Sequence, residues 1–332
     1  MRKLLAAFVI AIAAAVTGAG GSSAQEYTMK FGTTSVNDPQ TAFLKMYKED
    51  LERATGGRIK VDLYPQGQLG NAPRMIEAVQ IGSLEATMVP LDFYVGVDPR
   101  FGVFGAPMLF RDEPQAQKTI HDPEVEKALF SIARTKGLQG LGAEVIGFHG
   151  FGASTAILTL NDFKGKKLRI NGTPFEKMEM ALLGATGVGM PLSEVMPALS
   201  QGTVDGIASH ISVFVSFKMN DVAGTFLDTR ASVVASLAVV SSTWFDGLPP
   251  DLQKAVLASA TNIRPALDRW TAEFNEGQLR QWTDMGGKIV TLSPDEHAKL
   301  EQLFTPVGDG VTKEQSESAA MLKLVRDAAA RN

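Results

Sequence analysis

The sequence predicts an α/β protein made of two units of alternating strands and helices, joined by one long helix. Three observations support this prediction. Short apolar strands alternate with capped helices up to residue 147, the alternation restarts after Thr155, and a long helical segment runs from Pro250 to Trp282. The chain has 332 residues, whereas a typical domain has roughly 100–200, so two units are also expected from length.

The first unit shows clear helix starts and alternating apolar residues. Asp38 and Pro39 form a helix start, and Ile59, Val61 and Leu63 alternate as in a strand. The expected elements are, in order, a strand at 29–32, a helix from 39, a strand at 59–63, a helix from 73, a strand at 85–90, helices from 113 and 123, and a strand at 138–147. This β-α alternation predicts parallel strands with helices on both faces of the sheet.

The second unit repeats the pattern. A capping box at Thr173-Pro174 with Glu176 starts a helix that ends at Gly184. The other expected elements are a strand at 162–170, a strand at 188–190, a short helix from 193, and strands at 204–208 and 233–241. Pro265 inside the long helical segment predicts a kink or a break there.

Composition excludes some classes of function. Hydrophobic residues make up 45% and charged residues 20% of the chain, as in ordinary folded proteins. The formal net charge is −4, and the longest basic run is Lys164 to Arg169. Nucleic acid is therefore not an expected partner.

The first 24 residues have the pattern of a signal peptide. Arg2 and Lys3 precede an apolar run at 4–16, and Ser22-Ser23-Ala24 offers small residues for cleavage before Gln25. A membrane anchor is the alternative, but the run is short for a bilayer span. Without cysteine the exported chain has no disulfides, which favours a large periplasmic protein over a small secreted one.

Arg169 is the first candidate for binding. It lies one residue from the end of a predicted strand, just before a predicted helix start. Ligands of open α/β sheets gather at strand ends, where helix N-termini favour anions. We therefore expect Arg169 to hold an anion; the alternatives are a solvated arginine or one paired to a nearby acid.

His149 and His210 are further candidates, because each lies at or just after the end of a predicted strand. Together with Arg169 they could converge on one cleft, although each histidine alone could be a hydrogen-bonded structural residue. The chain has four histidines and no cysteine, and it lacks close histidine pairs, nucleophile elbows and nucleotide-binding glycine motifs. No metal site, cofactor or catalytic residue is predicted.

Four stretches resemble the extracytoplasmic solute-binding proteins of tripartite ATP-independent periplasmic (TRAP) transporters, the DctP family. They are "ATGGRIKVDLYPQGQLG" at 54–70, "DFKGKKLRI" at 162–170, "LLGATGVGMPLSEVMPALSQGTVDG" at 182–206 and "STWFDGLPPDLQKAV" at 242–256. The resemblance implies two α/β lobes around a ligand cleft, with a long helix across both. It suggests lobe I at 25–147 plus about 235–275 and lobe II at 148–234 plus about 276–332.

The resemblance also implies roles for individual residues. Arg169 matches the arginine of the family that pairs with a substrate carboxylate. His149 stands where well-known members have a second arginine, and Ser209, followed by His210, where they often have an asparagine. Thr34, Asn71 and Asp92 match positions of similar proteins near the cleft.

The implied function is a periplasmic receptor that binds a small organic acid without catalysis, as a monomer, and delivers it to the small and large membrane subunits of a TRAP transporter. Two alternatives stay open at this point. One is a periplasmic enzyme that acts on organic acids, and the other is a ligand-binding subunit of a sensory system.

Overall fold

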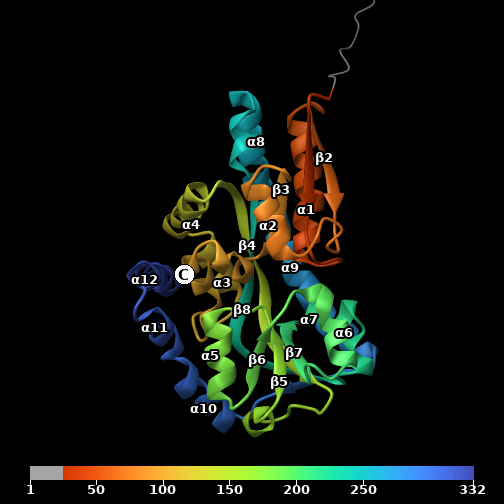
Figure 1. Cartoon of the computed structure of the whole chain (residues 1–332), viewed down its shortest axis with the longest axis vertical. Coiled ribbons are helices and arrows are strands. Elements are labelled where there is room, and N and C mark those ends of the chain that lie inside the picture. Colours follow the sequence, from red (N-terminus) through yellow and green to blue (C-terminus); the bar gives the residue numbers. More distant parts are fainter. Residues whose placement is uncertain (1–24) are drawn as a thin grey trace, which may run out of the picture.

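A computed structural model describes residues 25–332. The predicted signal peptide lies outside these residues. The described chain forms a nine-stranded mixed sheet with the order β2-β1-β3-β8-β4-β7-β5-β6, and β9 pairs with β8 off this path. Helices cover the sheet, so the predicted α/β class is confirmed (Figure 1). Within the described residues, none of the helices has the length and apolar character needed to cross a membrane.

The first lobe contains β1 to β3 with α1 and α2, at the top of Figure 1. The helix α1 begins at Pro39 as predicted, and α2 begins at Ala72, one residue before the predicted start; Asp38 and Asn71 accept backbone N–H groups of their first turns. The elements are β1 (Tyr27–Gly32), α1 (Pro39–Ala54), β2 (Ile59–Tyr64), α2 (Ala72–Gln80) and β3 (Ala86–Pro90).

A connecting segment leads from the first lobe to the centre of the molecule. It contains two 3₁₀ helices and two capped α-helices: η1 (Leu91–Gly96), η2 (Pro99–Gly105), α3 (Glu113–Ile120) and α4 (Pro123–Thr135). Asp112 and Asp122 cap α3 and α4 as predicted.

The strands β4 (Leu138–Ala153) and β8 (Thr225–Ser241) are longer than predicted and run between the two lobes (Figure 1). They pair with each other in antiparallel fashion, with register shifts at Gly140/Gly142, Val145/Gly147 and Phe148/Gly150. The prediction ended the first strand at residue 147, where Gly147 interrupts the apolar run; the antiparallel partner carries the strand past it.

The second lobe contains β5 to β7 with α5 to α7, in the lower half of Figure 1. The Thr173–Glu176 capping box starts α5 as predicted, whereas α7 was not expected. The elements are η3 (Leu160–Phe163), β5 (Lys167–Ile170), α5 (Pro174–Leu182), β6 (Thr186–Gly189), η4 (Leu192–Glu194), α6 (Val195–Ser200), β7 (Gly206–His210), α7 (Ile211–Ser216) and η5 (Met219–Asp221).

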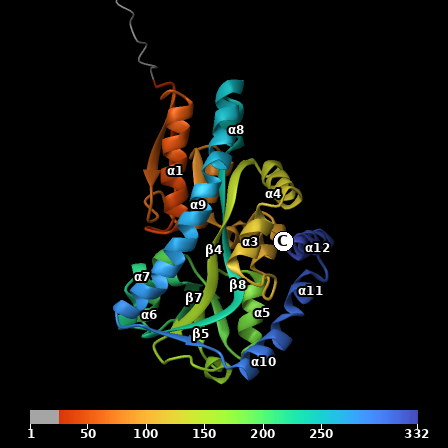
Figure 2. The ribbon, with the colours of Figure 1, turned by 180° about the vertical axis from the view of Figure 1, so that it is seen from behind.

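The helix α9 (Pro250–Asp284) crosses the back of the molecule over both lobes (Figure 2). At one end the hydroxyl of Tyr47 on α1 donates to the carbonyl of Val256, at 3.0 Å. At the other end Trp282 packs edge-on against Phe214 of α7, with ring centroids 5.8 Å apart. The helix continues through Pro265, so a break there is wrong, and the alternative of a kink stays a prediction.

The remaining elements were not predicted individually. They are α8 (Ser242–Asp246), β9 (Lys288–Thr291), α10 (Pro294–Phe304), α11 (Val307–Thr312) and α12 (Ser316–Arg331). The last helix packs beside α3 and η2 at the middle of the molecule, not at the far end of the second lobe (Figures 1 and 2).

The prediction of parallel strands is only partly right. Within each lobe the pairs β1–β2, β1–β3, β5–β6 and β5–β7 are parallel, but β3–β8, β4–β8 and β4–β7 are antiparallel. The antiparallel pairs arise because β4 and β8 run through both lobes in opposite directions. The predicted lobe boundaries near residues 147, 235 and 275 fall inside β4, β8 and α9, and they stay a prediction.

Candidate functional site

A cavity between the two lobes collects residues from the ends of several strands. Thr34 follows β1, Arg169 lies on β5, and Ser209 and His210 end β7. All four were predicted site residues, and all four line this cavity. The sequence analysis did not single out five other polar residues of the wall as site residues: Ser35, Asp38, Gln40, Asn171 and Ser212.

Arg169 is held in place by the fold around it. Its side chain is almost fully buried, with 2% of the residue exposed, and its Nε donates to the carbonyl of Met190 at 3.0 Å. This is its one hydrogen bond among the described residues, so the two terminal amino groups can serve a carboxylate. Burial lowers the pKa of Arg169 to about 10, although Glu176 and Asp92 act to raise it, so the guanidinium is charged near neutral pH.

His149 and His210 are brought together, but not by two strand ends. His149 lies inside β4 and is directly opposite His210 in the antiparallel β4–β7 pair, so its predicted place at a strand end is wrong. Gly147 makes room for this arrangement, since a Cβ atom at that position would lie 2.5 Å from Nε2 of His210. The Nδ1 of His210 accepts the backbone N–H of Ser212 at 3.3 Å.

Burial sets the charge of both histidines. It lowers the pKa of His210 to about 3, with His149 lowering it further. Burial also lowers the pKa of His149, although Glu176 acts in the opposite direction. Both rings are therefore neutral near pH 7 in this structure, and Nε2 of His149 has no hydrogen-bond partner among the described residues.

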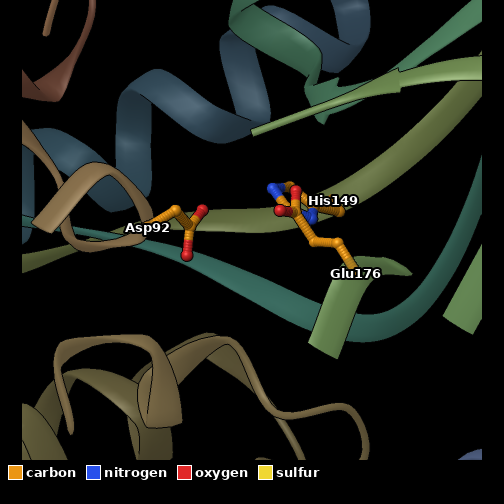
Figure 3. Close-up of side chains that lie close together, drawn as sticks. All are labelled: Asp92, His149 and Glu176. Carbon is orange, nitrogen blue, oxygen red and sulfur yellow. The ribbon is translucent and has the colours of Figure 1, made fainter. Parts of the chain in front are cut away.

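Asp92, His149 and Glu176 form a buried cluster, which we call the cleft cluster. One imidazole nitrogen of His149 and one carboxylate oxygen of each acid lie within 4.8 Å of one another, and Figure 3 shows the three side chains facing one another. Asp92 and His149 do not line the cavity. They lie close enough to Arg169 for charges to act between them. The cluster therefore lies beside the guanidinium and not in the wall that a ligand would touch.

The two carboxylates of the cleft cluster differ in their surroundings. Glu176 accepts the backbone N–H groups of Asn171, Gly172 and Thr173 at 2.8–2.9 Å. Asp92 accepts one hydrogen bond, from Nδ2 of Asn171 at 2.7 Å. Burial, followed by the charge of Glu176, raises the pKa of Asp92 to about 8. Asp92 thus holds a proton at neutral pH.

Asn71 lies apart from these residues. Its side chain caps α2 and accepts the backbone N–H of Arg74 at 3.2 Å, and it does not line the cavity. The sequence carried a signal for this capping role, since Asn71 stands two residues before Pro73 at a helix start. Ser212 likewise stands at a helix start, but α7 is too short to show a clear apolar period.

Two groups of described residues have the donors for a cation. One is the cleft cluster, and the other is His121, Glu144 and Asp268, which we call the rear cluster. In the rear cluster Nε2 of Gln117 donates to both carboxylates, at 2.8 Å to Asp268, and its Oε1 accepts the N–H of Val145 at 2.8 Å. The carboxylates of the rear cluster therefore already have partners within the protein, and a cation that binds there would have to replace these hydrogen bonds.

The family model of the bacterial extracellular solute-binding proteins, family 7 (DctP), matches residues 31–315. The chain belongs to this family. It is 30% identical to the 2,3-diketo-L-gulonate-binding periplasmic protein YiaO of Escherichia coli over 96% of both chains. It is also 30% identical to the C4-dicarboxylate-binding periplasmic protein DctP of Rhodobacter capsulatus over 93% of both chains.

Solved structures of the family share the fold. A sugar acid binding protein from Advenella mimigardefordensis, in complex with galactonate, superposes with a TM-score of 0.86 at 25% identity, over 92% of this chain and 98% of its own. A TRAP periplasmic solute-binding protein from Desulfovibrio salexigens, with bound orotic acid, gives a TM-score of 0.86 at 21% identity, over 92% and 99%. The two-lobed fold and the membership in a transport receptor family are therefore established.

Proposed function

We propose that this protein is the periplasmic receptor of a TRAP transporter and that it binds a small organic acid through Arg169. The acid is carried to a small and a large membrane subunit without being converted. The N-terminal pattern of residues 1–24 supports export, and the family model describes extracellular proteins. Solved relatives bind acids, galactonate and L-gulonate among them.

The observation that carries the proposal is the placement of Arg169 in the cavity between the lobes. A planar guanidinium presents two parallel N–H donors to one carboxylate, and this fixes the orientation of the ligand as well as its charge. The bond from Nε to Met190 already sets the plane of the group. A carboxylate that binds here meets a prearranged donor in a site from which water is largely removed.

The division into lobes supports a closing motion. The cavity is lined by residues on either side of the predicted boundary near residue 147, and the strands and helix that join the lobes are continuous. Rotation of one lobe against the other would open this cavity to the periplasm. The closed shape would then be the form that the membrane subunits recognise.

The test is a thermal-shift screen of the mature protein against monocarboxylates, dicarboxylates, sugar acids and uncharged sugars. A cognate acid at about 100 times its Kd adds roughly 2.7 kcal/mol to the free energy of unfolding, and we expect such a shift with acids only. Shifts restricted to uncharged sugars would refute the proposal. Recovery of the bound acid unchanged by mass spectrometry after long incubation separates the receptor from an enzyme.

A further inference from the structure

The cavity that contains Arg169 continues into a second one. Their volumes are about 40 Å³ and 90 Å³, and they share six lining residues: Thr34, Ser35, Asp38, Leu192, Ser212 and Val213. Arg169 borders the first cavity only, whereas Gln66, Ser216 and Phe217 border the second only. The guanidinium therefore lies at the end of the combined space that the first cavity forms.

Positive charge is confined to that end. Arg169 is the one arginine or lysine that lines either cavity in the described part of the chain. His210 also lines the first cavity, but its burial keeps the ring neutral. The pair His149 and His210 therefore does not replace the second arginine of well-known members by a second positive charge.

The second cavity has a polar wall without a cation. Hydroxyl groups come from Thr34, Ser35, Ser212 and Ser216, and among the described residues Asp38 is its single ionisable side chain. Asp38 is 3% exposed and accepts the N–H of Thr41 at 3.0 Å as the cap of α1. With or without its proton it supplies no positive charge. The hydroxyl group of Ser35 lies beside the carboxyl group of Asp38, and both line the two cavities, where a ligand hydroxyl group could bind between them.

From this layout we infer that the ligand is an elongated hydroxy acid with a single carboxylate, not a dicarboxylate. This inference rests on the proposed binding of an organic acid. The carboxylate pairs with Arg169, and hydroxyl groups along the chain exchange hydrogen bonds with Ser35, Ser212 and Asp38. A second carboxylate at the far end would lose its hydration without gaining a cation, next to an acidic side chain.

The two relatives at 30% identity do not decide this point, because one is named for a diketo sugar acid and the other for C4-dicarboxylates. The distribution of charge in this chain favours the first kind of ligand. This preference depends on both cavities together, since Arg169 alone would accept a monocarboxylate or a dicarboxylate.

The experiment compares matched pairs of acids that differ at one end only, by calorimetry on the wild-type protein. The pairs are galactonate with galactarate and threonate with tartrate; in each pair a terminal hydroxymethyl group is replaced by a carboxylate. We expect the monocarboxylate of at least one pair to bind about 30-fold more tightly than its partner. A dicarboxylate that binds equally well or better would overturn the inference and leave the organic acid receptor intact. Failure of every acid in the screen would instead refute the proposed function.

A variant places a charge at the uncharged end. Ser216 lies on α7, is exposed and borders the second cavity, so Ser216→Arg adds a guanidinium there without disturbing the core. In the pair of acids that shows binding, we expect Ser216→Arg to lower the ratio of the affinity for the monocarboxylate to that for the dicarboxylate at least threefold. Ser216→Gln, which is long but uncharged, should leave this ratio unchanged. If Ser216→Arg does not change the ratio, the far end of the ligand does not lie in the second cavity, and the inference is wrong.

Discussion

The cleft cluster and the rear cluster contain the same kinds of residue but differ in how far their hydrogen bonds are satisfied. Each brings one histidine and two carboxylates within 4.8 Å. In the rear cluster Gln117 bridges the two carboxylates, and Nε2 of His121 donates to the carbonyl of Ala143 at 2.9 Å. In the cleft cluster Nε2 of His149 has no partner among the described residues, and Asp92 has one donor.

The titration of the two histidines differs accordingly. Burial opposes a proton on His121, but the Glu144 carboxylate overcomes this effect and raises the pKa of the ring. The pKa of His149 is lowered, because burial is joined by the charge of Arg169. The hydrogen bonds of Gln117 and His121 thus join the end of α3 to β4 and α9. The cleft cluster lies beside Arg169, so a negative charge added at the guanidinium acts on its titration.

The largest expected effect is on Arg169. Arg169→Lys keeps a positive charge but loses the two parallel donors, so we expect affinity for the best acid of the screen to fall about 100-fold, or about 2.7 kcal/mol. Arg264→Lys is the matched control, since Arg264 is partly buried near the rear cluster and pairs with Glu126. Calorimetry on both variants tests the comparison, and binding by Arg169→Lys within about threefold of wild type would contradict it.

The rear cluster should matter for stability and not for binding. Gln117→Leu leaves the 2%-exposed Glu144 without its amide donor, and we expect the free energy of unfolding to fall by about 2 kcal/mol. Urea titration measures this loss, and calorimetry should show the affinity unchanged within about threefold. A large loss of affinity with little loss of stability would show that the rear cluster takes part in ligand binding.

The third expected effect is a pH dependence of binding that arises in the cleft cluster. The charged or titratable groups that face Asp92 are Glu176 and Glu179 on α5, Arg169 on β5 and His149 on β4. An anion on Arg169 raises the pKa of Asp92 further, so binding takes up a proton when the pH exceeds the ligand-free value of about 8. Affinity is therefore constant at lower pH, falls as the pH rises through about 8, and levels off above the pKa of the complex.

Calorimetry from pH 6 to 9.5 should show this decrease as about tenfold, or about 1.4 kcal/mol. Asp92→Asn, which mimics the protonated side chain, should abolish it, whereas Glu144→Gln in the rear cluster should not. His149→Gln is also expected to leave it in place, because the pKa of His149 is lowered by burial and the expected decrease lies at higher pH. If the pH dependence is lost in His149→Gln but persists in Asp92→Asn, then His149 and not Asp92 is the residue that takes up the proton on binding.

The position of Arg169 illustrates how much of the candidate site could be predicted from the sequence. The strand, the loop and the helix start follow one another within a few residues, and the capping box of α5 joins residues three positions apart. The same is true of the helix starts at Asp38, Asp112 and Asp122. Such local signals, together with the resemblance to a family, were sufficient for the fold class and led to the binding residue that we propose.

The pairing of His149 with His210 shows where local signals end. Both strands were recognised in part, but their antiparallel register depends on β8, which pairs with β4 over most of its length and reverses the direction expected from β-α alternation. Asn71 shows the opposite case. It matches a position near the cleft in similar proteins, yet here its side chain is used by a helix cap.

Local sequence therefore specified the helix starts, most of the strands and the arginine at a strand end, because helix caps join neighbouring residues and strands show a local alternation of apolar residues. The tertiary structure alone decided which side chains in and beside the cleft are charged near neutral pH. Burial neutralises His149, His210 and Asp92, and leaves Arg169 as the cation of the cavity. The physical reason is that a pKa depends on desolvation and on charges brought together from distant strands, and neither can be read from neighbouring residues.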